Sequence, residues 1–457
     1  MKNSILLAAL SCLALTAWPT TRSEAGGFYQ PPHGVRGMGR AGAMVASEAD
    51  LHGLWYNPAL LAGIEGTEIL VDVGFSSQSV EFSRAPRLLP NGESRTFETV
   101  NSETAVVPAP QLAVSSDFGL DRVVFALGAY APNGAPGKYP EFGPQRYTLI
   151  DSEGSLILTM ELAVAAKITD WLWIGGGFQN TFVTLRLINM VSAFPGTTGE
   201  AEDPEFDILL KTDLSSPFNP SANMGIWAEP YEGVQLGLSL QLPTHIEDKE
   251  AKVTTRLPSH PFFDGATVSG DTVAGSFDLP MILRGGLRYE APRWDVEIDA
   301  ALEFWSVFDQ INTTPKDIEI SGLEPGLGSV SVGPLNIPRL YENALSIRVG
   351  GDYEAAIDRL WLRAGALWEQ SAVPTKTLSV LQVDSDKLAI GLGATLRVGP
   401  SLRIDVGYSH IFYAARDVTD SVVEQLNPTN PEGAVVVGNG AYEASGDLFG
   451  IGARFDL

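Results

Sequence analysis

Cysteine is almost absent from this sequence, which is also short of basic residues and of long apolar runs. The single cysteine among 457 residues, Cys12, lies in an apolar N-terminal stretch. Disulfide bonds and thiol chemistry are therefore excluded for the rest of the chain. An exported chain of this length without disulfides needs another source of stability, such as a closed hydrogen-bonded sheet.

Residues 1–25 have the features of a cleavable signal peptide. Met1-Lys2-Asn3 is a short basic start, Ile5 to Trp18 is an apolar run, and Ser23-Glu24-Ala25 is a small-x-small cleavage site. This pattern predicts export and a mature chain that begins near Gly26. The alternative is a membrane anchor, but the apolar run is shorter than a membrane-spanning helix requires.

Basic residues are few: the chain has 30 lysines and arginines against 55 aspartates and glutamates, and its net charge is −25. Nucleic acid is excluded as a partner, because its phosphates would be repelled. After residue 25 there is no run of about 18 apolar residues, so the sequence predicts no transmembrane helix. Any membrane-spanning structure must then be a β-barrel, because only helices and closed barrels satisfy every backbone polar group in lipid. The acidic residues are compatible with a membrane if they lie in loops and in a lumen.

From about Thr67 onward, apolar and polar residues alternate with the period of two that is typical of β-strands. The clearest example is residues 293–305. Its apolar face carries Trp294, Val296, Ile298, Ala300, Leu302 and Phe304, and its other face carries Asp295, Glu297, Asp299, Ala301 and Glu303. Arg284 and Arg288 on the preceding strand would lie opposite these acids, which favours a salt-bridged wall over a substrate path.

The strand and turn signals mark about 14 strands, whose connections alternate between short and long. The expected strands are 67–80, 105–117, 121–131, 154–168, 171–188, 218–229, 233–249, 273–289, 293–311, 339–354, 358–375, 384–397, 401–416 and 441–457. An outer-membrane barrel has short periplasmic turns and long external loops. A soluble sandwich also alternates, but it has no reason to sort its connections in this way. The sequence therefore predicts an all-β fold, a 14-stranded antiparallel transmembrane β-barrel over residues 67–457 in the bacterial outer membrane.

The last expected strand is amphipathic and ends the chain. One face carries Phe449, Ile451, Ala453, Phe455 and Leu457. The barrel-assembly machinery usually recognises such a terminal strand, so this machinery and outer-membrane lipid are the expected partners. The usual last residue is aromatic, and Leu457 departs from that pattern.

Residues 26–66 do not alternate and are rich in glycine and alanine. Gly37-x-Gly39-x-x-Gly42 formally matches a dinucleotide-binding fingerprint, but no strand precedes it and no βαβ unit surrounds it. The glycines are better interpreted as tight packing in a small compact element. Such an element could sit inside the mouth of the barrel, so we predict an N-terminal plug over residues 26–66.

Three stretches of this segment resemble the N-terminal plug of the long-chain fatty-acid outer-membrane transporters, the FadL/TodX family. They are Gly37-Met38-Gly39-Arg40-Ala41, Ala49-Asp50 and Trp55-Tyr56-Asn57-Pro58-Ala59-Leu60, and similar stretches follow at 127–134, 143–147, 304–308 and 371–374. The resemblance covers nearly the whole mature chain. It implies a barrel closed by a plug, in which ligand binds in an external groove of long loops and then in an interior pocket. The resemblance also implies that the ligand leaves through a lateral opening near a kink in the third strand and that the plug gates this opening. Such a route suits a hydrophobic molecule, because it leads into the bilayer and not into water.

The implied function is passive transport of hydrophobic molecules, with long-chain fatty acids as the expected ligand. The plug motif comprises Gly37, Gly39, Arg40, Asn57, Pro58 and Ala59. Pro58 restricts the backbone of Asn57, and the Asn57 amide can satisfy backbone groups in the lumen. The alternative for these residues is a plain turn.

Two kinds of residue are candidates for binding the ligand. A carboxylate needs a cation, and Arg186 and Lys316 lie near positions where the family places basic contacts. Apolar loop residues favour a binding groove; the candidates are Phe194, Phe262 and Phe263. The alternatives are ordinary loop or wall positions for the two cations and loop-on-loop packing for the phenylalanines.

Other functions stay open at this stage. The same route could carry aromatic hydrocarbons, or the barrel could be a surface adhesin or structural protein with acidic loops. An enzyme is not predicted, because Ser409 and His410 are strand neighbours that point to opposite faces. The five histidines show no paired metal-ligand spacing, so no metal site and no cofactor are predicted.

Overall fold

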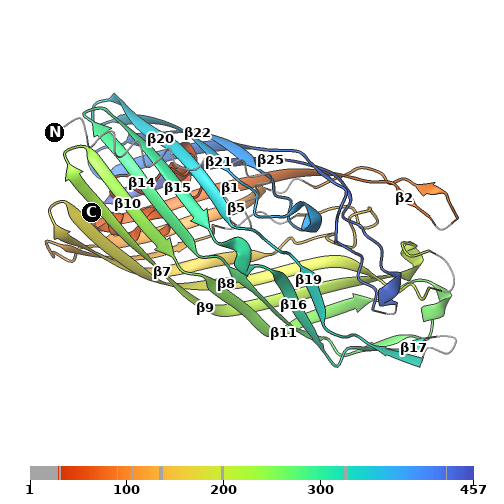
Figure 1. Ribbon diagram of the computed structural model, residues 1–457. Helices are drawn as coiled ribbons and strands as arrows, with labels where there is room; N and C mark the ends of the chain where they lie inside the picture. The colour runs from red at the N-terminus through yellow and green to blue at the C-terminus, as the bar shows by residue number, and fades with distance from the viewer. Residues whose placement is uncertain are drawn as a thin grey trace.

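The computed structural model is a long cylinder of tilted antiparallel strands (Figure 1). It describes Tyr29 and residues 32–89, 91–103, 106–132, 137–196, 200–323, 328–428 and 430–457. The predicted signal peptide, residues 1–25, lies outside the described residues. Among the described residues, no helix is long and apolar enough to cross a membrane.

Fourteen strands, counted over the described residues, follow one another in chain order around a closed antiparallel ring. The first and the last close it: β1 (Thr67–Arg84) pairs with β25 (Gly440–Asp456) along its length. Between them the ring contains β5 (Val106–Ser116), β6 (Val123–Tyr130), β7 (Leu156–Thr169), β8 (Leu172–Ser192), β9 (Asp207–Tyr231), β10 (Val234–Gln241) with β11 (Thr244–Arg256), β13 (Thr272–Leu279) with β14 (Ile282–Ala291), β15 (Trp294–Glu303) with β16 (Gln310–Lys316), β19 (Leu335–Pro338) with β20 (Ala344–Ala356), β21 (Leu360–Glu369), β22 (Lys387–Arg397), and β23 (Leu402–Tyr413) with β24 (Arg416–Val418). The predicted fold class is confirmed.

Several ring strands are interrupted where the sequence removes a backbone donor or inserts a turn. Pro243 separates β10 from β11 and Pro280 separates β13 from β14, because proline has no N–H to give to the ladder. A short turn, η4 (Trp305–Val307), separates β15 from β16. These interruptions leave the order of strands in the ring unchanged.

The connections alternate in length as predicted (Figure 1). Short turns join the strands at the end where the C-terminus lies, which is the periplasmic end of such a barrel. Longer connections at the other end carry short elements of their own. These are β2 (Arg87–Leu88), β3 (Ser94–Arg95), β4 (Val100–Asn101), η2 (Pro204–Phe206), η3 (Pro261–Phe263), β12 (Thr267–Ser269), β17 (Glu319–Leu323), β18 (Gly328–Ser331), η5 (Thr375–Thr377) and η6 (Pro431–Gly433).

The outer surface of the ring is apolar and its inner surface is polar. In β15, Trp294 and Ile298 are exposed, whereas Asp295, Glu297 and Asp299 are buried in the lumen. Aromatic side chains are exposed near the periplasmic turns; they are Trp171, Tyr231, Tyr289, Trp294 and Tyr353. An apolar outer band with an aromatic rim is the surface that a bilayer requires.

The N-terminal segment, residues 32–66, lies inside the cylinder, and we call it the plug. It contains α2 (Val35–Gly39), α3 (Gly53–Tyr56) and η1 (Pro58–Gly63). Its helix α2 packs against β22 and β23, and η1 packs against β7, β8 and β9.

Glycines on the wall make the plug fit. A Cβ atom at Gly365 would collide with the carbonyl of Arg40, and one at Gly225 would collide with the Asn57 side chain. Other wall glycines meet the plug backbone in the same way; they are Gly175, Gly237, Gly350, Gly391 and Gly407. The plug backbone therefore lies directly against the strands, a close approach that only glycine allows.

Candidate ligand-binding site and plug

Asn57 joins the plug to the barrel wall. Its Nδ2 donates hydrogen bonds to the carbonyl oxygens of Val45 at 2.8 Å and of Ile226, on β9, at 3.1 Å. Its Oδ1 accepts a hydrogen bond from the backbone N–H of Ala59 at 3.1 Å, just after Pro58 begins η1. One side chain thus satisfies three backbone groups inside the lumen, which is the structural part of its predicted role. Its role in switching stays a prediction.

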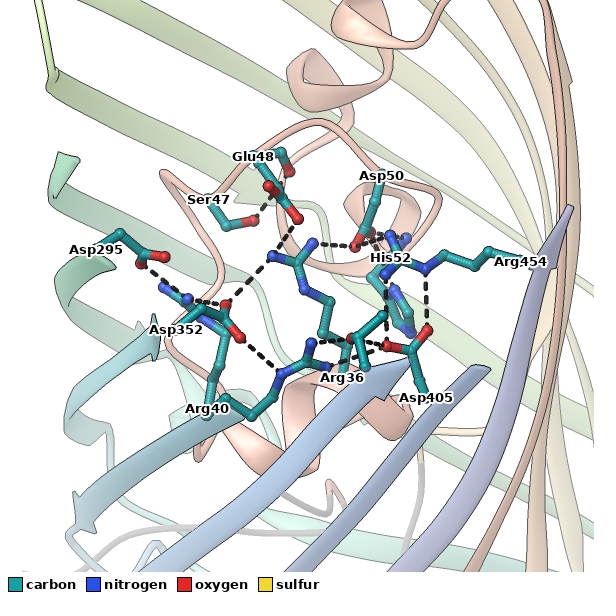
Figure 2. A network of polar contacts seen from close by, with 12 residues as sticks. Arg36, Arg40, Ser47, Glu48, Asp50, His52, Asp295, Asp352, Asp405 and Arg454 are labelled. Atoms are coloured by element: carbon teal, nitrogen blue, oxygen red, sulfur yellow. Dashed lines mark hydrogen bonds and ion pairs between the residues drawn. The ribbon is translucent and has the colours of Figure 1, made fainter. Parts of the chain in front are cut away.

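Arg40 anchors the plug electrostatically (Figure 2). Its guanidinium is fully buried and pairs with Asp295 at 2.9 Å, with Glu297 at 2.8 Å and with Asp352 at 2.5 Å. These carboxylates belong to β15 and β20, and Arg40 Nε also donates to the carbonyl of Ala43 at 2.8 Å. A buried guanidinium with all these acceptors is held in one place.

The same network continues across the lumen (Figure 2). Arg36 pairs with Asp50 at 2.6 Å and with Glu48 at 2.6 Å, both within the plug. On the wall, Arg454 of β25 pairs with Asp405 of β23 at 3.0 Å. Arg454 also lies 3.8 Å from Asp50. Plug and wall therefore share one continuous set of charges at the periplasmic end, in which Glu48 is half exposed and the other named side chains are buried.

Two plug histidines are fixed in opposite charge states. His52 lies between Asp50, at 3.0 Å, and Asp72 of β1, at 2.9 Å. Burial alone would lower the pKa of His52, but the two carboxylates outweigh it and raise this pKa to about 10. Burial and the positive charge of His52 lower the pKa of His33 to about 3. At neutral pH His52 is therefore a cation and His33 is neutral.

An interior cavity of about 170 Å³ lies on the external side of the plug. Its apolar lining includes Val80, Val107, Leu156, Leu185, Leu187 and Val380, and its polar lining includes Ser76, Gln78, Asp384, Lys387 and Tyr413. Tyr29, just before the plug, also lines it. A cavity lined by both aliphatic and polar side chains suits an amphiphilic molecule.

Lys387 is the cation that lines this cavity among the described residues. Its Nζ pairs with Asp384 at 2.7 Å and with Glu369 at 3.0 Å, so its charge is already neutralised. Ser371 also donates to Asp384, at 3.0 Å. Burial raises the pKa of Asp384 to about 7, against the opposing effect of Lys387.

Beside the cavity, part of β5 and part of β7 have no β6 partner among the described residues. The third strand of the ring, β6, ends at Tyr130, which pairs with Gln111 of β5 and Thr159 of β7. Beyond this point Val106 to Pro110 of β5 and Leu156 to Leu158 of β7 have no β6 partner. Pro108, Ala109 and Leu156 line the cavity, and Leu156 is 48% exposed at the molecular surface.

Two prolines lie in the stretch of β5 that has no described β6 partner. Pro108 and Pro110 alternate in phase with Leu112, whose carbonyl oxygen faces Gly128 of β6. Backbone N–H groups point alternately to the two sides of a strand. The nitrogen atoms of Pro108 and Pro110, which carry no hydrogen, therefore face the side of β5 on which β6 lies. The break lies at the level of the outer aromatic residues Phe75, which pairs with Pro108, and Phe182, which pairs with Leu158.

The cations predicted from sequence are not among the residues that line the cavity. Leu185 and Leu187 point into it, so Arg186 between them lies on the opposite face of β8, half-buried. Lys316 is exposed at the outer end of β16. Their roles in binding a carboxylate stay predictions.

The predicted loop phenylalanines do come together. Phe263 is buried in an apolar cluster with Phe206 and Ile320, and Phe194 and Phe262 pack on its edge. The rings of Phe262 and Phe263 are 5.0 Å apart, edge to face. This is loop-on-loop packing, and the half-exposed Phe194 and Phe262 could still form the rim of a groove.

The predicted salt-bridged wall holds for one arginine and not for the other. Arg288 pairs with Asp295 at 3.2 Å and with Glu290 at 2.8 Å. Arg284 has no ion pair among the described residues: its register partner on β15 is Ala301, and the diagonal acids Asp299 and Glu303 accept hydrogen bonds from the plug backbone and from Trp305. Alternation along the strand indicates that these side chains share one face, but it does not indicate that Arg40 of the plug pairs with Asp295 and Glu297. Lys387, Asp384 and Tyr29 were likewise missed, because only the closed ring brings them together.

A closed barrel with an apolar outer surface, a plugged lumen and an interior cavity defines an outer-membrane transport barrel. Residues 16–457 match the family model described as outer membrane protein transport protein (OMPP1/FadL/TodX), and the chain belongs to this family. It is thus a transport protein of the bacterial outer membrane and not an enzyme. None of the curated proteins shows significant sequence similarity to it.

Solved structures share the fold at low sequence identity. A Pseudomonas aeruginosa FadL homologue has a TM-score of 0.75 at 17% identity, over 94% of this chain and 100% of that one. The P. putida toluene transporter TodX has a TM-score of 0.65 at 15% identity, over 95% and 99% of the two chains. The Ralstonia pickettii toluene transporter TbuX has a TM-score of 0.59 at 15% identity, over 92% and 98%.

Proposed function

We propose that this protein carries hydrophobic molecules, with long-chain fatty acids first among them, from the cell exterior into the outer membrane. The ligand enters between the external loops, occupies the interior cavity and leaves sideways where β6 ends. The observation that carries this proposal is that the interior cavity reaches a stretch of wall where, among the described residues, β5 and β7 have no β6 residue between them.

The plug supports a sideways route. Its backbone meets wall glycines around the lumen, and Arg40 ties it to β15 and β20. An axial path to the periplasm would require a hydrophobic molecule to pass this buried, charged layer, which costs several kcal/mol for each polar group that it displaces. A sideways exit leads directly into hydrocarbon, where the molecule is most soluble.

Aromatic hydrocarbons are the second candidate ligands. The solved structures of similar fold include toluene transporters, and aliphatic side chains form part of the cavity lining. Lys387 offers no free charge to a carboxylate, because Asp384 and Glu369 already pair with it. A fatty acid therefore needs another cation in the lumen, whereas a hydrocarbon needs none.

Uptake by cells that lack their own transporter tests the proposal. Cells expressing the chain should take up labelled oleate several-fold faster than empty-vector cells when the supply is limiting. The substitution Ala131→Trp fills the cavity beside the end of β6 and should reduce the rate towards that of the vector. Labelled toluene, tested in parallel, separates the two ligand classes.

A matched control places the same bulky residue on the lipid face away from the break. Leu236→Trp on β10 replaces a side chain that is 44% exposed on the outer surface of the barrel, and uptake should stay unchanged. Heat-modifiable electrophoretic mobility reports whether each variant has a folded barrel. Uptake of both ligands no faster than the vector would refute the transport proposal. Full activity of Ala131→Trp would refute the exit at β6.

A further inference from the structure

Glu161 is a buried carboxyl group beside the point where β6 ends. It lies on β7, faces the lumen and is 1% exposed. Among the described residues it forms no ion pair, whereas the buried carboxylates Asp405 and Glu297 are paired with arginines. An ionised carboxylate without a cation is strongly unfavourable in such surroundings. The contacts of Glu161 therefore bear on its charge state.

One oxygen of Glu161 accepts hydrogen bonds from two neutral side chains. Oε2 accepts from the Tyr130 hydroxyl at 2.6 Å and from Gln179 Nε2 at 2.9 Å. Tyr130 and Gln179 belong to the neighbouring strands β6 and β8, and Gln179 Nε2 also lies 2.9 Å from the Tyr130 hydroxyl. These bonds fix the position of the carboxyl group but bring no positive charge to it.

The other oxygen of Glu161 converges with a second acceptor. Gly177 of β8 leaves room for two side chains to meet above it, and a Cβ atom there would collide with both Glu161 Oε1 and Asn223 Oδ1. Both oxygens are shielded from water, and neither has a donor among the described residues. Two buried acceptors that converge without a hydrogen atom are unfavourable, so one of the two groups has to supply that hydrogen.

Rotation of the Asn223 amide does not supply it. Asn223 lies on β9, and its Nδ2 donates to the carbonyl oxygen of Leu54 in the plug at 2.8 Å. Exchange of the amide nitrogen and oxygen would give Glu161 a donor but would place an oxygen against the Leu54 carbonyl, which cannot donate. A proton on Glu161 satisfies all of these groups, because Oε1 then donates to Asn223 Oδ1 while Asn223 Nδ2 still donates to Leu54.

We propose that Glu161 is protonated at neutral pH and is the positioning residue that joins the end of β6 to the plug. Its O–H donates to Asn223, which holds the Leu54 carbonyl, and its Oε2 accepts from Tyr130, the last residue of β6. The Tyr130 ring also packs against Trp55 of α3, at 5.9 Å. The protonation of Glu161 is independent of the proposed function, whereas its importance for the exit at β6 rests on that function.

Two ionisable groups lie on the aromatic side of this cluster, and neither pairs with Glu161. The His33 ring is 5.6 Å from the Tyr130 ring, and His33 is neutral at neutral pH because its pKa is lowered to about 3. The Arg284 guanidinium lies over the Trp55 ring, 4.7 Å from its centre, and forms no ion pair with Glu161. The neighbours of Glu161 are thus those of a neutral acid.

Infrared difference spectroscopy of the purified barrel tests the charge state. The spectrum of the wild type minus that of Glu161→Gln, both at neutral pH, should contain the carbonyl band of a protonated carboxylic acid. A glutamine presents the same pattern of one donor and one acceptor. Glu161→Gln should therefore fold and change hydrogen–deuterium exchange of α3 by less than about 2-fold. Carboxylate bands in place of the carboxylic acid band would overturn the proposal.

A matched control makes the same chemical change at an ionised carboxylate. Asp72 Oδ2 accepts from the backbone N–H of Val35 at 2.8 Å and pairs with the His52 cation at 2.9 Å. Asp72→Asn removes this charge and should raise the exchange of plug peptides by at least about 10-fold. An increase in Glu161→Gln as large as that in Asp72→Asn would show that Glu161 is ionised and would overturn the proposal.

Variants that remove the hydrogen bonds test the positioning role. Glu161→Leu loses both the donor and the acceptor, so it should raise the exchange of α3 by about 10-fold and slow oleate uptake several-fold. Tyr130→Phe removes the bond between β6 and Glu161 and serves if Glu161→Leu does not fold. Wild-type exchange and wild-type uptake in the folded variants would overturn the positioning role. Oleate uptake by the wild type no faster than the vector would refute the proposed function and leave the infrared result on Glu161 intact.

Discussion

Removal of the Arg40 guanidinium should release the plug from the wall. In Arg40→Met, Asp295 keeps its contact with Arg288 at 3.2 Å, and Asp352 keeps Arg363 at 2.8 Å. Glu297 loses its cation and keeps only the backbone N–H of Ala46, at 2.6 Å. Deleting one partner of a buried ion pair costs about 3–5 kcal/mol, because the remaining charge is left without compensation. The equilibrium between docked and undocked plug should therefore shift by about 10²- to 5 × 10³-fold.

Hydrogen–deuterium exchange of the purified barrel measures this shift. Peptides from the plug, including α2, should exchange faster by about that factor, whereas wall peptides such as β22 should not change. A second substitution, Glu297→Gln, should recover part of the loss in Arg40→Met, because it removes the uncompensated charge. Unchanged plug exchange in folded Arg40→Met would refute the view that this ion network holds the plug.

Three further predictions concern the plug and the loops. Because the pKa of His52 is raised to about 10, its contribution to plug docking is complete below its unfolded value, near 6.5, and is lost as the pH rises through about 10. The lowered pKa of His33, about 3, has the opposite sign: its contribution is present above about 6.5 and is lost as the pH falls towards 3. Both contributions are complete only near pH 6.5, so protection of the plug against exchange should be greatest there and should fall on either side. Gly365→Val should displace the plug and raise its exchange, whereas Gly285→Ala, which meets nothing within 4 Å, should change nothing. Phe263→Ala should destabilise the external loop cluster by about 3 kcal/mol or more and increase loop proteolysis; unchanged oleate uptake in this variant would identify the cluster as loop packing and not a binding groove.

The ring of strands was predictable because the bilayer imposes a simple pattern. Each strand must present apolar residues to lipid and polar residues to the lumen, so the period of two is visible in the sequence. The residues 293–311 and 384–397 expected as strands correspond to β15 with β16 and to β22. The outer half of β9 was missed: the expected strand began at 218, whereas β9 begins at Asp207. Outside the membrane both faces of a strand meet water, so the alternation disappears, and Pro217 and Pro220 look like loop residues.

The candidate site was only partly predictable. The plug motif could be found because glycines and Asn57-Pro58 leave a local signature. The pairing of Arg40 with β15 joins residues more than 250 positions apart, and alternation along one strand carries no information about such partners. The same holds for Arg284, which the pattern assigned to a salt-bridged wall and which has no ion pair among the described residues but lies over the ring of Trp55 in the plug.

The end of β6 brings two requirements into conflict. A passage through the side of a barrel needs backbone without a neighbour, and hydrocarbon penalises each bare N–H or C=O by several kcal/mol. Pro108 and Pro110 remove two of the donors that would otherwise be bare on this edge. Replacing the two prolines would add backbone N–H groups that need an acceptor. These groups would favour pairing of β5 with an extended β6. These two imino acids thus lower the energy of an unpaired edge on β5 and oppose the pairing of a neighbouring strand with it.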